Sequence, residues 1–80
     1  MEIEEILIID SEVNELFKSI TDSIKLKLIN YATNNSYHSF TNELGVLIDN
    51  DVDIIFNHDF RWWYDSIQDY IYYNNIHGNN

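Results

Sequence analysis

The chain has 80 residues, fourteen of them Asp or Glu and four Lys or Arg, which gives a formal net charge of −10. Its 45% hydrophobic and 15% aromatic content is too high for a disordered chain of this charge, so residues 1–80 are predicted to form one folded acidic domain. The charge argues against direct binding of DNA or RNA and against an anionic membrane surface.

Cysteine and proline are absent, and glycine occurs only at Gly45 and Gly78. The lack of Cys excludes disulfides, thiolate zinc sites and Cys nucleophiles. No apolar stretch approaches the ~18 residues of a membrane span, and residues 1–5 carry acid where a signal peptide carries base. Few turn signals favour helices. We therefore expect a cytoplasmic, all-α protein, a small bundle of about three helices.

The first predicted helix covers residues 11–31, with Asp10 or Ser11 as its N-cap. Its apolar residues recur at helical spacing: Val13, Leu16, Phe17, Ile20, Ile24, Leu28 and Tyr31. Residues 3–9 fit either a helical extension or a short strand. The helix is favoured because no second convincing strand exists to pair with a strand there.

A loop at residues 33–36 separates this helix from a second one, predicted at 37–50 with Ser36 or Ser39 as its cap. The apolar stripe of this second helix is Tyr37, Phe40, Leu44, Leu47 and Ile48. Gly45 weakens the helix by roughly 1 kcal/mol relative to Ala and is compatible with a close helix crossing.

The third predicted helix covers residues 51–74, with a break near 57–58 compatible with the sequence, and residues 75–80 are expected to be a frayed tail. Its expected apolar face is Val52, Phe56, Phe60, Trp63, Ile67 and Tyr70. Its expected polar face is Asp51, His58, Arg61, Asp65 and Asp69, with Tyr72 beside it and Asp59 at the edge of the apolar face.

The aromatic run at residues 60–64 leaves two interpretations open. Four aromatic side chains in such a run cannot all face one core from a helix, and Trp62 and Tyr64 flank the inward face. They either widen a buried three-helix core, or they join Tyr72 and Tyr73 on a dimer or target surface, where Trp and Tyr make good anchors.

Catalytic and metal motifs are lacking. Residues 49–53 begin like a calcium loop, but the sixth and twelfth positions hold Ile54 and Phe60 instead of Gly and an acidic ligand. The histidines show no ligand spacing: His38, His58 and His77. No nucleophile elbow or phosphate-binding glycine loop occurs. We expect no enzymatic activity, no cofactor and no metal.

The second half of the chain carries most of the unbalanced charge. Residues 41–80 hold seven acids and one base, whereas residues 1–40 hold seven acids and three bases. Asp49 and Asp53, like Asp65 and Asp69, are four residues apart, which is about 6 Å along a helix and comparable to the spacing of DNA phosphates. These acids serve solubility, favour a helix N-terminus, or imitate a DNA backbone.

The stretch 40–60 resembles the phage anti-restriction family called Ocr. The shared elements are a short acidic helix followed by Asp49, Asn50, Val52, Phe56 and Phe60. The resemblance implies a helical, dimeric DNA mimic that occupies the DNA groove of restriction enzymes. This chain is shorter and lacks a heavily acidic C-terminal tail. Anti-CRISPR proteins and uracil-DNA glycosylase inhibitors use the same strategy, so the strategy is carried over without a particular target.

A second resemblance is to bacteriocin immunity proteins, which are small, acidic and helical and set acidic and aromatic residues against a nuclease. Its cue is Asp65 and Asp69 beside Tyr70, Tyr72 and Tyr73. A plain helical dimerisation or adaptor protein is a further alternative.

The sequence therefore predicts a phage-encoded, homodimeric DNA mimic. It would block the basic DNA site of a CRISPR nuclease or restriction enzyme stoichiometrically. The expected partner-binding carboxylates are Glu43, Asp49, Asp51, Asp53, Asp59, Asp65 and Asp69. The expected aromatic anchors are Trp62, Tyr64 and Tyr72.

Overall fold

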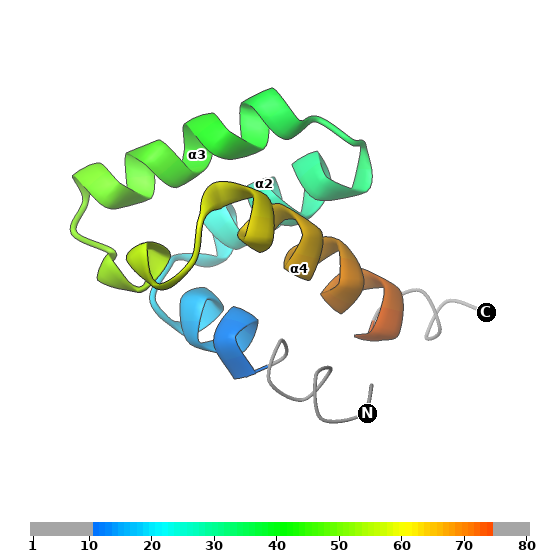
Figure 1. Ribbon diagram of the computed structural model, residues 1–80, viewed down its shortest axis with the longest axis horizontal. Helices are drawn as coiled ribbons and strands as arrows, with labels where there is room; N and C mark the ends of the chain where they lie inside the picture. The colour runs from blue at the N-terminus through cyan, green and yellow to red at the C-terminus, as the bar shows by residue number, and fades with distance from the viewer. Residues whose placement is uncertain (1–10, 75–80) are drawn as a thin grey trace.

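A computed structural model describes residues 11–74 of the chain. Residues 11–18 are helical and are followed by α2 (Asp22–Thr33), α3 (Tyr37–Asp49), the 3-10 helix η1 (Asp53–Asn57) and α4 (Phe60–Asn74) (Figure 1). The described range contains no strand, which confirms the all-α prediction, with four α-helical segments in place of about three. The expectations for residues 3–9 and for the tail at 75–80 lie outside the described residues.

The prediction of a single helix over residues 11–31 is wrong, because the helix is interrupted at residues 19–21. The Ser19 hydroxyl donates to the Glu15 carbonyl at 3.0 Å and closes the first segment. Thr21 is extended (ψ 161°), and its Oγ1 accepts the Ile24 N–H at 3.3 Å, so Thr21 is the N-cap of α2. Ile20 remains half-buried, which explains why the apolar spacing continues across the break.

The helix α3 ends in a Schellman motif centred on Asp51, whose φ is 66°. The Asp51 N–H donates to the Ile48 carbonyl at 3.0 Å, and the Val52 N–H donates to the Leu47 carbonyl at 3.0 Å. Asn35, with φ 58°, follows α2 in the same conformation. Asp and Asn are the non-glycine residues that best tolerate this left-handed backbone. Asp51 therefore ends one helix and cannot begin the next.

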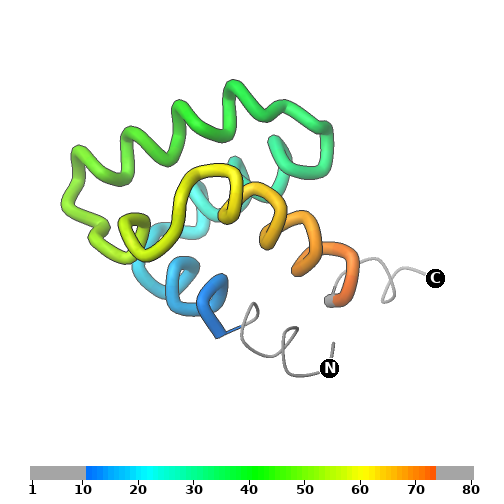
Figure 2. The backbone as a smooth tube through the Cα atoms, viewed as in Figure 1, coloured from blue at the N-terminus to red at the C-terminus, as the bar shows by residue number. Residues whose placement is uncertain are grey.

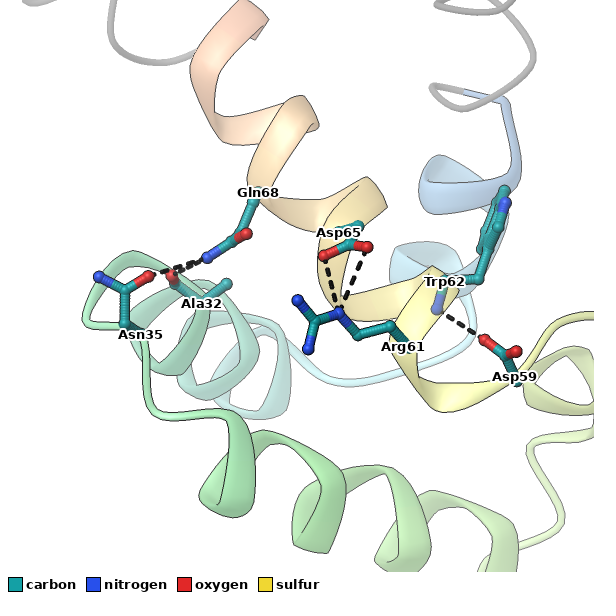
Figure 3. Close-up of polar contacts among 7 residues, drawn as sticks. All are labelled: Ala32, Asn35, Asp59, Arg61, Trp62, Asp65 and Gln68. Carbon is teal, nitrogen blue, oxygen red and sulfur yellow. Dashed lines mark hydrogen bonds and ion pairs between the residues drawn. The ribbon is translucent and has the colours of Figure 1, made fainter.

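The third predicted helix is divided near residues 57–58, where the sequence is compatible with a break, but its range of 51–74 is wrong in its first part because residues 51–57 are not α-helical. His58 is extended (φ −147°, ψ 163°) and separates η1 from α4. The Asp59 carboxylate accepts the Trp62 N–H at 2.7 Å and caps α4 (Figure 3). The break changes the phase of the residues before it. Phe56 is consequently 67% exposed, although a continuous helix would have placed it in the core.

The core lies where α2 packs against both α3 and α4, with segment 11–18 alongside (Figure 2). Its fully buried large side chains are Val13, Leu16, Leu28, Phe40, Leu44, Leu47, Ile55, Trp63 and Ile67. The Trp63 indole N–H donates to the Ile55 carbonyl at 3.0 Å and fastens η1 to α4. Gln68 Nε2 donates to the Ala32 carbonyl at 3.0 Å and to Asn35 Oδ1 at 3.2 Å, which joins α4 to the end of α2 (Figure 3).

Gly45 does not mark a close helix crossing. A Cβ built at this position meets nothing within 4 Å, and the residue lies inside α3. Replacing Gly45 by Ala is therefore expected to stabilise the protein by about 1 kcal/mol, because Ala loses less backbone entropy in a helix. Urea denaturation of Gly45→Ala would measure the gain, and an unchanged or lowered midpoint would contradict it.

Candidate interaction surface

The predicted carboxylates remain at the surface. Glu43 on α3 is half-exposed, and the six aspartates are exposed: Asp49, Asp51, Asp53, Asp59, Asp65 and Asp69. The chain gathers them in two groups. We call Asp49, Asp51, Asp53 and Asp59 the acidic corner, because they border η1 between the end of α3 and the start of α4. Asp65 and Asp69 form a second group one turn apart on α4.

One predicted spacing is wrong. Asp49 is the last residue of α3 and Asp53 the first residue of η1, so the two are not neighbours on one helix. The positive φ of Asp51 turns the chain between them. Asp65 and Asp69 do lie in one helix, as the sequence predicts. Any likeness to regularly spaced phosphates is therefore confined to α4, and the acidic corner presents its charges around a bend.

Basic side chains neutralise little of this charge. Within residues 11–74, the pairing of Arg61 Nε with Asp65 Oδ1 at 3.3 Å is the single Lys or Arg ion pair with a carboxylate (Figure 3). The Arg61 guanidinium also lies 5.3 Å from the Tyr37 ring centroid and 5.6 Å from that of Tyr64. The Arg61 guanidinium thus contacts side chains of the same chain. Both partners of the exposed ion pair remain accessible to solvent.

Asp69 is electrostatically unfavourable in the folded protein. Partial burial raises the pKa of its carboxyl above the ordinary value of 3.8, and the Asp65 carboxylate raises that pKa further. The folded protein therefore binds more protons than the unfolded chain just above pH 3.8, so the contribution of Asp69 to stability falls as the pH rises through this range.

We expect Asp69→Asn to raise the thermal unfolding midpoint at pH 7 by about 2 °C, because it removes a partly buried charge and a like-charge pair worth a few tenths of a kcal/mol. The advantage should disappear below pH 3.8, where the wild-type carboxyl is protonated. Asp65→Asn is the matched control and should gain less, since it also removes the ion pair with Arg61. Thermal melts from pH 3 to 7 would check this, and a difference independent of pH would contradict it.

The aromatic anchors are placed differently from one another. Tyr64 is 5% exposed and packs edge-to-face against Tyr37 and Phe40 at centroid distances of 4.8 and 5.2 Å, so its prediction as a surface anchor is wrong. Trp62 is half-buried. Tyr72 is 52% exposed on the last turn of α4.

The prediction that His58 lies on the polar face of a helix is also wrong, because His58 lies between η1 and α4. Its ring stacks on Trp62 with centroids 3.5 Å apart, and its Nε2 is buried without a hydrogen bond, 3.7 Å from Glu12 Oε1. In Figure 3 the Trp62 side chain points toward segment 11–18, whereas Arg61 and Asp65 point away from it. The Trp62–His58 stack joins α4 to the residue before Asp59, and His58 in turn lies close to Glu12 of segment 11–18.

Two shallow hollows lie on the described surface. A shallow hollow of about 220 Å³ is lined by Ala32, Thr33, Asn35, Gln68, Ile71 and Tyr72. Another of about 370 Å³ is lined by Lys18, Ser19, Ile20, Thr21, Ile24, Leu47, Asn50 and Val52. No group of three potential metal ligands occurs among residues 11–74, and no helix in this range is long and apolar enough to cross a membrane.

No protein-family model matches this chain, and no curated protein or solved structure matches it. A functional proposal therefore rests on the surface itself: seven accessible carboxylates between residues 43 and 69 with Arg61 as the one basic side chain among them.

Proposed function

We propose that this protein is an acidic DNA mimic that inhibits a bacterial DNA-binding defence enzyme, such as a CRISPR nuclease or restriction enzyme. It acts stoichiometrically by occupying the enzyme's basic DNA site. The observation that carries the proposal is the concentration of exposed carboxylates on one stretch of chain, with a single ion pair to Arg61. Such a surface attracts Lys and Arg side chains arranged to bind phosphates.

Two features of the surface favour a polyanion mimic over simple solubility. Asp51 occupies a left-handed position where Gly would be less strained, so its carboxylate is kept at a cost in backbone energy. Asp65 and Asp69 repel each other within one helix, and the pKa of the Asp69 carboxyl is raised first by partial burial and then by this repulsion. A cationic partner would relieve the repulsion on binding.

Competition with DNA tests the proposal. Fluorescently labelled DNA would be bound to a purified, guide-loaded CRISPR nuclease and, separately, to a restriction enzyme, and the protein would be titrated into each. Displacement that weakens as salt is raised from 50 to 300 mM supports mimicry. A stable complex of enzyme, DNA and protein together would exclude mimicry for that enzyme.

A second candidate is a helical dimerisation or adaptor protein. The exposed Tyr72 and Tyr73 favour it, because their rings lie edge-to-face at 5.1 Å on the last turn of α4. Under this function, Asp65→Asn/Asp69→Asn would leave association unchanged and Tyr73→Ala would weaken it. Sedimentation of the two variants separates this candidate from the mimic.

A further inference from the structure

Phe56 is the most exposed large hydrophobic side chain among the described residues, at 67%. It lies in the short 3-10 helix η1, at the end of the molecule away from the last turn of α4 (Figure 1). An exposed Phe contributes nothing to the core of the isolated chain. Aromatic side chains of this kind are typical anchors in protein interfaces, where they fill a pocket of the partner.

The backbone beneath Phe56 is fixed. The preceding residue, Ile55, is 1% exposed, so its side chain is locked in the core. The Ile55 carbonyl accepts the Trp63 indole N–H at 3.0 Å and the His58 backbone N–H at 3.5 Å. The backbone that carries Phe56 is therefore held in place, and little backbone entropy is lost when a partner covers its ring.

Three carboxylates flank Phe56 along the chain, those of Asp51, Asp53 and Asp59. Side chains three residues apart eclipse one another in a 3-10 helix, which sets Asp53 beside Phe56. Asp51 and Asp59 lie on either side of η1 and are exposed. The sequence has no Lys or Arg from residue 28 to residue 60. A second copy of the chain is a poor occupant, because the same carboxylates would face each other.

We infer that Phe56 is the anchor of the acidic corner and that its partner is a nucleic-acid-binding groove in which Lys and Arg side chains surround a pocket for an unstacked base. This inference rests on the proposed function and names the kind of site that the mimic fills. An aromatic ring flanked by carboxylates reproduces a base flanked by phosphates, and grooves for single-stranded or flipped nucleotides combine cationic and aromatic side chains. The wall of a plain duplex groove offers no such pocket.

Two peptides of equal charge serve as probes. One is a chain of eight lysines, and the other carries a tryptophan between two groups of four lysines. Each is titrated into isotope-labelled protein at low salt, and binding is followed by NMR. Phe56→Ala is expected to weaken binding of the tryptophan peptide about three- to tenfold, because an aromatic pair is lost. The affinity for the all-lysine peptide should change by less than about twofold. Asp51→Asn/Asp53→Asn should weaken both.

Leu26→Ala is the matched control, since Leu26 is 63% exposed but lies between Lys25 and Lys27. It should leave both peptides unaffected. One outcome would contradict the role of Phe56 as an anchor: Phe56→Ala binds both peptides like the wild type, while Asp51→Asn/Asp53→Asn binds neither. The charge-based function would still stand. If the Asp variant binds normally, or neither peptide binds, the proposed function fails with the inference. Sedimentation that shows a dimer lost on Phe56→Ala would overturn the inference in favour of a second copy.

Discussion

Simultaneous replacement of Asp49, Asp51, Asp53, Asp65 and Asp69 by Asn is expected to weaken binding to the defence enzyme about 100-fold. Each exposed carboxylate contributes a fraction of a kcal/mol to an ion pair with the partner, so five together lose roughly 3 kcal/mol. A single replacement should change binding by only about threefold. The DNA displacement assay gives the affinities, and most of the loss should appear in the association rate at low salt.

A control must separate the position of the charges from their number. Asp65→Asn/Asp69→Asn and Glu15→Gln/Asp22→Asn each remove two exposed carboxylates and leave the same net charge. Under the proposed function, the first pair weakens binding and the second has little effect. Equal losses for the two pairs would show that net charge alone matters, and a specific acidic surface would then be excluded.

Asp59 is left intact in these variants because it has a structural role as well. Its carboxylate caps α4 through the Trp62 N–H at 2.7 Å. The sequence placed this residue at the edge of an apolar face, since a continuous helix was assumed from residue 51 onward. Several acids of the corner are in fact linked to helix ends: Asp59 caps α4, Asp51 closes α3, and Asp53 is the first residue of η1. Capping and partner binding are compatible for an exposed carboxylate.

The correctly predicted elements have strong local signals. The helix α3 has a Ser before it, an apolar stripe that ends at Ile48, and turn-forming Asn residues on either side. The inward positions of Trp63 and Ile67 were also predicted, because both lie within the uninterrupted α4. The break at residues 19–21 was missed because apolar spacing does not require a continuous helix, and the break near residues 57–58 was named without its effect on the helical phase. Ile20 and Ile24 face the core on both sides of the Thr21 cap.

The placement of the aromatic residues could not be obtained from periodicity. Tyr64 and Phe56 were predicted in opposite environments from those observed, since Tyr64 is 5% exposed and Phe56 is 67% exposed. The buried position of Tyr64 depends on Tyr37 and Phe40, which approach it from α3. The exposure of Phe56 depends on the extended backbone at His58, which changes the phase between η1 and α4. The first is a contact between residues far apart in the sequence, and the second is a turn. The apolar spacing within one helix reveals neither of them.

Trp63→Ala is expected to lower the free energy of unfolding by at least about 3–5 kcal/mol. Trp63 is fully buried, and truncation of a buried Trp costs about 3–5 kcal/mol. A domain of this size has a total stability of about 4–12 kcal/mol, so the loss is a large part of the whole. The same change also leaves the buried Ile55 carbonyl without the indole N–H that it accepts at 3.0 Å. Circular dichroism with urea denaturation measures both effects.

Trp63→Phe separates the two contributions, because it retains an aromatic ring and removes the hydrogen bond to Ile55. It should cost about 1–3 kcal/mol, which leaves a folded protein in which η1 is less firmly attached to α4. The NMR signals of Phe56 and Asp53 should then broaden, and binding of the tryptophan-containing peptide should weaken even though Trp63 itself is buried. Phe56→Ala should change stability by no more than about 0.5 kcal/mol. Unaltered peptide binding by a folded Trp63→Phe variant would show that the acidic corner does not depend on this hydrogen bond.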